Sequence, residues 1–86
     1  EQNYPNPFNP VTNIAYDIPV TPQGFVHVKL IIYDVLGNEV EILVDKVQPA
    51  NHYSVKFYEK NLPSGIYIYT LKAGNYFTAR KMVLLK

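Results

Sequence analysis

The stretch that decides the fold is Gly24 to Tyr33, which reads GFVHVKLIIY. Apolar side chains occupy every second position through most of this stretch, namely Val26, Val28, Leu30 and Ile32. His27 and Lys29 lie between them. Because successive side chains of a β-strand point to opposite faces, this alternation predicts a strand with one buried and one polar face.

A turn at Asp34 to Asn38 is expected to end this strand. Asp34 can accept hydrogen bonds from the next backbone N–H groups along the chain, and Gly37 can adopt the positive φ that a tight turn needs. The same alternation of apolar and polar residues recurs on both sides of this region. It predicts further strands at Thr12 to Ile18, Glu39 to Val44, His52 to Tyr58, Gly65 to Lys72 and Tyr76 to Leu85.

Turn-forming residues separate the predicted strands. We expect a turn at Gln48 to Asn51, with Asn51 in the left-handed conformation, and a short hairpin loop at Ala73 to Asn75. No window has the periodicity of a helix. Six or seven short strands separated in this way are typical of an antiparallel all-β sandwich, which is the fold class that we predict.

Residues 1–10 read EQNYPNPFNP and are richer in Pro and Asn than the rest of the chain. Proline removes a backbone donor and keeps the preceding residue out of the helical region, so we expect an extended lead-in with Tyr4 and Phe8 as aromatic anchors. Residues 11–86 are expected to form the sandwich as one domain. The chain opens on Glu1 without a leader pattern, and we expect it to be part of a longer protein.

The run LPSGIY at residues 62–67 has the layout of a tyrosine corner. In such a corner Leu62 would close the end of the core, Gly65 would permit the reversal, and a Tyr early in the next strand would bond back to the upstream backbone. Tyr67 is the better candidate for that bond and Tyr69 the alternative. The chain has eight Tyr. We interpret most of them as core or corner residues, and an exposed platform for stacking sugars is the alternative.

Composition excludes several classes of site. The chain has no Cys, and therefore no disulfide or thiolate metal site. Its longest uninterrupted apolar runs are four residues, which is too short to span a bilayer. The net charge of +1 lacks the basic excess of a nucleic-acid-binding domain.

The charge is divided unevenly along the chain. Residues 1–43 carry a net −4 and residues 44–86 a net +5. We expect acidic early strands and basic late strands to become neighbours in one sheet. A basic end that meets a partner is the alternative.

No residue pattern indicates catalysis. His27 and His52 fall on predicted polar faces without a neighbour at metal-ligand spacing, and Ser54 and Ser64 lie in no nucleophile motif. The carboxylates fall mostly at turns or on solvent faces. We therefore predict a non-catalytic domain with no metal and no cofactor.

The chain ends on an apolar strand flanked by lysines, which consists of Lys81, Met82, Val83, Leu84, Leu85 and Lys86. One face of it would hold Met82 and Leu84, and the other Lys81, Val83 and Leu85. Such a strand can simply complete the sheet, with its charges discouraging edge pairing. The alternative is an exposed edge that is offered to another protein by β-augmentation.

Taken together, the motifs match a known family. Residues 4–10, YPNPFNP, with Thr12, Ile14 and Tyr16 after them, resemble the opening of the C-terminal sorting domain of the type IX secretion system. This system exports proteins across the outer membrane of Bacteroidetes and related bacteria. The resemblance continues through IYDVLGNEV at 32–40, PANHY at 49–53, LPSGIY at 62–67 and KMVLLK at 81–86. It covers essentially the whole chain, and the one departure is Asn51 where the family usually has Gly.

The resemblance implies an immunoglobulin-like sandwich at the end of a larger exported protein. The secretion machinery would recognise it, a sortase-like peptidase would remove it, and an N-terminal cargo domain would precede it in the same chain. The protein would pass through the periplasm and reach the cell surface or the extracellular space. Carried onto this chain, the opening motif Tyr4, Pro5, Asn6, Pro7 and Phe8 marks the domain boundary. The closing residues 81–86 carry recognition by the translocon.

Two other functions compete with a sorting signal. One is a carbohydrate-binding accessory module of a secreted enzyme. The other is a structural immunoglobulin-like spacer, similar to the domain of flagellar hook-capping proteins that has the same corner motif. Exposed edge strands would also permit a weak homodimer.

Overall fold

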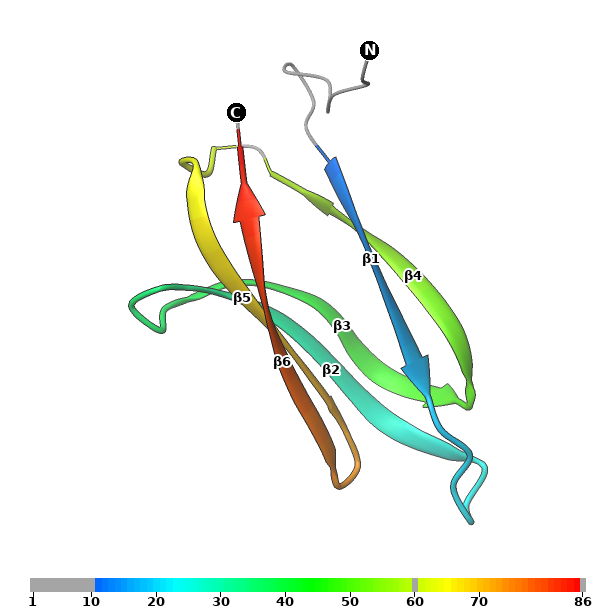
Figure 1. Cartoon of the computed structure of the whole chain (residues 1–86). Helices are drawn as coiled ribbons and strands as arrows, with labels where there is room; N and C mark the ends of the chain where they lie inside the picture. The colour runs from blue at the N-terminus through cyan, green and yellow to red at the C-terminus, as the bar shows by residue number, and fades with distance from the viewer. Residues whose placement is uncertain (1–10, 60, 86) are drawn as a thin grey trace.

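The computed structural model describes residues 11–59 and 61–85 of the chain (Figure 1). It consists of six strands: β1 (Val11–Ile18), β2 (Phe25–Asp34), β3 (Glu39–Pro49), β4 (Asn51–Tyr58), β5 (Gly65–Ala73) and β6 (Tyr76–Leu84). The predicted all-β sandwich is confirmed. The opening motif and Lys86 lie outside the described residues. No described segment forms a helix that is long and apolar enough to cross a membrane.

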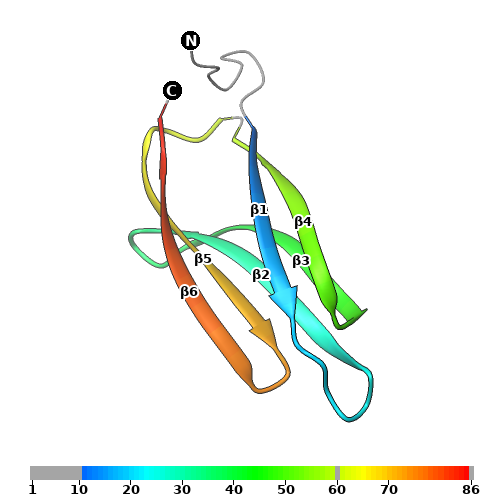
Figure 2. The same ribbon diagram turned by 45° about the vertical axis from the view of Figure 1, so that its right-hand side comes forward.

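The strands form one sheet of two strands, in the order β1-β4, and one of four, in the order β3-β2-β5-β6. Every pairing within the two sheets is antiparallel. The smaller sheet lies in front of part of the larger one (Figure 2). β1 begins and β6 ends at the same end of the sandwich.

The core lies between the two sheets and agrees with the alternation that the sequence shows. Val28, Leu30 and Ile32 of β2 have no exposed surface, and Phe57 of β4 is equally buried from the other sheet. The remaining buried members of the core are Ile14, Tyr16, Ile18, Val44, Tyr67, Leu71, Ala73 and Leu84. Because both sheets contribute apolar faces, neither sheet is expected to be stable alone.

Tyrosine hydroxyls join the small sheet to the edge strand β3. The Tyr16 hydroxyl donates to Gln48 Oε1 at 2.9 Å, and both residues are buried. The Tyr53 hydroxyl donates to the Pro49 carbonyl oxygen at 2.6 Å. The Tyr16 and Tyr53 rings stack with their centroids 5.4 Å apart. Burial raises the pKa of Tyr16 above its ordinary value, with the Gln48 hydrogen bond acting in the opposite direction and neighbouring Tyr53 adding to the rise.

Two local predictions around β3 are wrong. The strand does not end at Val44 but continues to Pro49, because β2 is long enough to pair with it as far as Phe25. Lys46 and Gln48 follow Val44 at alternate positions, so no apolar alternation indicates this extension. Asn51 does not adopt a positive φ, because it is the first residue of β4; its Oδ1 accepts a hydrogen bond from the His52 N–H at 2.8 Å.

Early and late strands do become neighbours, β1 beside β4 and β2 beside β5, but the acidic β3 and the basic β6 do not. β3, which carries Glu39 and Glu41, forms one edge of this sheet, and β6 forms the other. The bases Arg80 and Lys81 of β6 therefore pair with Tyr69 and Ile68, not with carboxylates. The positive charge of the last strand remains at a sheet edge.

Candidate functional site: the C-terminal edge strand

β6 has one face in the core and one face in solvent. Leu84 is 2% exposed and half-buried Met82 packs against the core. On the opposite face Val83 is 57% exposed, and Leu85, just beyond the strand, is 75% exposed. The predicted division of the closing residues into two faces is therefore the observed one, and Met82 and Leu84 hold the strand in place.

The outward face of β6 continues onto its neighbour β5. Val83 lies directly opposite Ile66, which is 44% exposed, and Lys81 lies opposite half-buried Ile68. Cross-strand partners on one face are close enough for their side chains to touch. Together with Leu85 these residues form what we call the tail patch: Ile66, Ile68, Lys81, Val83 and Leu85.

The tail patch borders an unpaired sheet edge. β6 is bonded to β5 on one side, and no strand of the described residues pairs with its other side. An unpaired edge strand presents backbone donors and acceptors to an incoming chain. In the part of the chain that the structure describes, Arg80 and Lys81 form no ion pair, so this edge also carries uncompensated positive charge.

The tyrosine corner fixes the start of the strand that β6 pairs with. The Tyr67 hydroxyl donates to the Pro63 carbonyl oxygen at 2.8 Å, which confirms Tyr67 as the corner residue. Gly65 has a φ of 156°, and half-buried Leu62 packs against the core as predicted. Tyr67 lies opposite Met82 in the sheet. The corner therefore supports the tail patch from the inside.

The turn after β2 is built around one carboxylate, as the sequence predicts. Asp34 Oδ1 accepts hydrogen bonds from the backbone N–H groups of Leu36 and Asn38, each at 2.9 Å. Gly37 has a φ of 87° and its N–H donates to the Asp34 carbonyl oxygen. The backbone N–H of Asn38, above all, lowers the pKa of Asp34 below its ordinary value, because these donors favour the charged form.

The two histidines each contact one carboxylate on the surface. His27 Nε2 lies 2.5 Å from Asp45 Oδ1, and His52 Nδ1 contacts Asp17 Oδ1. Each of these two pairs links neighbouring strands. No cluster of three or more potential metal ligands exists within residues 11–59 and 61–85.

The exposed aromatic residues form no shared platform. Four of the described aromatics are largely exposed: Phe25, Tyr58, Tyr76 and Phe77. No two of them are cross-strand partners, and the last two are consecutive in β6, so they point to opposite faces. Stacking on a flat sugar surface needs rings on one face, and this arrangement does not favour the carbohydrate-binding alternative.

The chain is thus a small β-sandwich whose last strand has a free edge and an outward face that is both apolar and basic. Residues 2–85 match the model of the secretion system C-terminal sorting domain, and the chain belongs to this family. No curated protein and no solved structure matches the chain significantly. The resemblance drawn from the motifs is thereby confirmed.

Membership in this family defines the general function. The domain is a C-terminal sorting signal for the type IX secretion system, it acts on the secretion machinery as a cargo signal, and it implies export toward the cell surface or the extracellular space. Such sorting domains are in general non-catalytic.

Sequence reasoning located the last strand but missed part of the surface around it. Ile66 and Ile68 were assigned only to a strand, and nothing in their local pattern signals that they lie beside Val83 and Lys81. Only the antiparallel register of β5 and β6 brings them together. A hairpin prediction with its register fixed at the Ala73 to Asn75 loop would have found them.

Proposed function

We propose that the type IX machinery reads the folded domain through the tail patch and the free edge of β6. The observation that carries the proposal is the two-faced last strand: Leu84 is buried while Val83 and Leu85 are mostly exposed. Val83 and Leu85 lie beside an unpaired strand edge, where an incoming chain can contact both side chains.

The physical basis is strand addition combined with side-chain docking. Backbone groups along the unpaired edge of β6 can form a ladder with an extended segment of the partner, which gives affinity. Alternate side chains then supply specificity, and on this strand the outward ones are Lys81, Val83 and Leu85. The uncompensated charges of Arg80 and Lys81 favour an acidic partner surface and speed its encounter.

The remaining steps of the pathway concern the other end of the domain. We place the cargo domain before β1 in the same chain, with the opening motif at residues 4–8 as the boundary, and cleavage by a sortase-like peptidase upstream of it. The domain has no Cys, so its folding during export through the periplasm would depend on no disulfide. Since β1 begins at the end of the sandwich where β6 finishes, the cargo would precede the domain at the end that carries the tail patch.

The test compares two matched substitutions. Val83→Asp places a charge on the outward face of the last strand. Val47→Asp does the same on β3, the opposite edge strand of the same sheet, at a residue that is 56% exposed. Each variant is fused behind a reporter in a bacterium with the type IX system, and the reporter is measured in the periplasm, on the surface and in the medium.

We expect Val83→Asp to hold the reporter in the periplasm, and Val47→Asp to be delivered as the unmodified domain is. Thermal unfolding of both variants establishes that each one folds. Normal delivery of a folded Val83→Asp variant, or equal retention of both variants, would refute recognition through the tail patch. Deletion of residues 81–86 is expected to retain the reporter in the same way.

The free edges also support weak self-association. β1 and β4 are the two strands of a two-stranded sheet, and β3 and β6 are the edges of the larger one. We expect a monomer that pairs weakly at high concentration, measurable by sedimentation velocity across a concentration series. A sedimentation coefficient that stays constant across the series would contradict this expectation.

A further inference from the structure

A pair of lysines forms a distinct feature on the outer face of the large sheet. Lys29 of β2 and Lys72 of β5 are directly opposite each other in the antiparallel register. Like charges in directly opposite positions destabilise a sheet. These two strands are the central pair of the four, so the sheet fixes the backbone positions of the two lysines beside each other.

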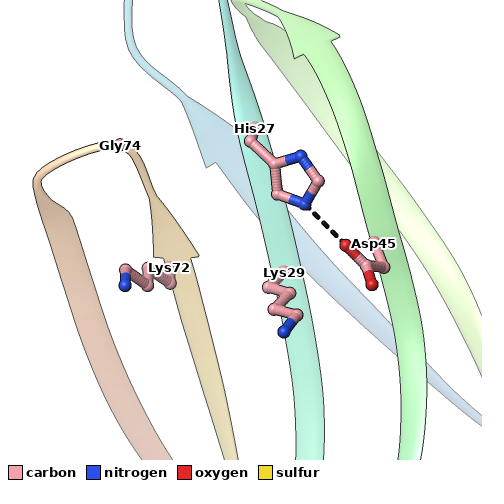
Figure 3. Close-up of a pocket in the computed structure, with 5 residues that line it drawn as sticks. All are labelled: His27, Lys29, Asp45, Lys72 and Gly74. Carbon is pink, nitrogen blue, oxygen red and sulfur yellow. Dashed lines mark hydrogen bonds and ion pairs between the residues drawn. The ribbon is translucent and has the colours of Figure 1, made fainter.

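Neither ammonium group is neutralised by the protein. Within residues 11–59 and 61–85, no carboxylate forms an ion pair with Lys29 or Lys72. The nearest candidate is Asp45, which lies opposite Lys29 on β3. Its Oδ1, however, lies 2.5 Å from His27 Nε2 (Figure 3). Asp45 is bonded to His27, and no ion pair with a described residue balances the positive charges of the two lysines.

The lysines line an open hollow. Its volume is about 340 Å³, and its lining consists of His27, Lys29, Asp45, Lys72 and Gly74. Figure 3 shows the four side chains on the same side of the sheet, below the β5–β6 loop that contains Gly74. Two lysines and one carboxylate give this hollow a net positive charge, which attracts an anion.

Gly74 lies at the rim of this hollow, in the loop that joins β5 to β6. It has a φ of 61°, and a Cβ at this position would lie 2.8 Å from Cγ2 of Val26. A side chain is therefore disfavoured on both conformational and steric grounds. The Gly74 N–H also donates to the His27 carbonyl oxygen at 3.4 Å, which ties the loop to β2. Val26 packs against the core, so this contact lies on the core side of the loop and fixes the position of the loop beside the hollow.

We propose that this hollow is a binding site for a phosphate group, with Lys29 and Lys72 as the two ligating cations. Two ammonium groups on one face of the sheet can each donate a charge-assisted hydrogen bond to an anion that has several oxygen atoms. The site lies toward the β5–β6 loop, away from the end at which β6 finishes. A phosphate there would not compete with recognition of the tail patch. The phosphate can be free in solution or belong to a lipid headgroup.

The first experiment titrates the ¹⁵N-labelled chain with inorganic phosphate at constant ionic strength, with chloride as the balancing anion. We expect saturable shifts of the amide signals of Lys29, Lys72 and Gly74. Lys72→Gln is expected to weaken this binding about tenfold, because it removes one hydrogen bond to a charged group. Lys56→Gln, on the other sheet, removes the same charge and is expected to leave the affinity unchanged.

A third variant tests the role of the neighbouring acid. Asp45→Asn removes the negative charge beside Lys29 and is expected to raise the affinity for phosphate about twofold to fivefold, the range of an exposed charge pair. A lower affinity of this variant would contradict the assignment of the lysines as the ligands, because it would make Asp45 part of the site. Circular dichroism spectra confirm that each variant keeps the strand content of the parent chain.

The second experiment distinguishes the two sources of phosphate. The chain is sedimented with vesicles of phosphatidylcholine alone and with vesicles that also contain phosphatidylglycerol. Binding to the mixed vesicles that Lys72→Gln reduces and Lys56→Gln does not assigns the site to a lipid headgroup. Site-specific shifts with inorganic phosphate but no vesicle binding assign it to free phosphate. Shifts spread over all lysines, or equal effects of the two Lys→Gln variants, overturn the proposal.

Discussion

Removal of one hydroxyl group at the tyrosine corner tests how far that corner stabilises the domain. Tyr67→Phe keeps the ring, which is buried against the core, and deletes the hydrogen bond to the Pro63 carbonyl oxygen at 2.8 Å. The substitution removes the hydrogen bond and leaves the Pro63 carbonyl oxygen without this partner. We expect the free energy of unfolding to fall by about 1 to 2 kcal/mol.

The effect should be easy to measure in a chain of 86 residues. In domains of this size each kcal/mol shifts Tm by about 4 to 8 °C, so the expected decrease is about 5 to 15 °C. Urea denaturation monitored by circular dichroism gives the free energy, and a calorimetric scan gives Tm. Because Tyr67 pairs with Met82, hydrogen exchange at the end of β6 should also become faster.

The matched control is Tyr69→Phe, two residues further along the same strand. The Tyr69 side chain is half-buried and makes no hydrogen bond with the described residues. Its substitution is expected to change the free energy of unfolding by less than about 0.5 kcal/mol. Equal destabilisation by the two variants, or none by Tyr67→Phe, would refute the corner as a source of stability.

Burial and the direction of pKa changes lead to three further predictions. Leu84→Ala should lower the free energy of unfolding by about 2 to 4 kcal/mol in urea denaturation, whereas Val83→Ala should change it by less than about 0.5 kcal/mol; equal effects would contradict the assigned faces. The raised pKa of Tyr16 stabilises the fold below the ordinary value of 10.0, and this contribution is lost as pH rises through the higher folded value. As pH rises through this range, the free energy of unfolding of Tyr16→Phe should therefore fall less than that of the parent chain. Urea denaturation at several pH values measures both, and parallel pH profiles would refute this. The lowered pKa of Asp34 stabilises the fold above 3.8, and this contribution is lost as pH falls through the lower folded value. Asp34→Ala should be less stable than the parent chain at neutral pH, with the gap closing in acid; a gap that persists in acid would contradict the carboxylate's role.

Local patterns in the sequence predicted much of the fold because they act through neighbouring residues. The alternation in β2 identified its buried face, and the turn at Asp34 and the corner at Tyr67 formed the predicted hydrogen bonds. Each of these features depends on residues within a few positions along the chain. A short segment of sequence is enough to show which face of a strand is buried and which side chain can bond to a nearby backbone group.

The errors come from partners that are distant in the sequence. Nothing near Val44 indicates that β3 continues, because its extension depends on the length of β2, with which residues 44–49 pair in continuous register. Gln48 was assigned to a turn, yet it is buried and bonded to Tyr16, 32 residues away. The opposition of Lys29 and Lys72 likewise depends on the pairing of β2 with β5. Side-chain type alone does not determine which strands become neighbours.

The last strand can carry both a core contact and a signal because the period of a β-strand is two. Substitutions on its outward face change what a partner contacts and leave the buried Leu84 untouched. The two functions are nevertheless coupled, because the tail patch exists only while β6 is paired with β5, which brings Ile66 next to Val83. A partner that reads this patch therefore distinguishes a folded domain from an unfolded one, although both contain the same closing residues. On the proposed recognition, the register of the β5–β6 hairpin is therefore part of the signal, together with the order of the last residues.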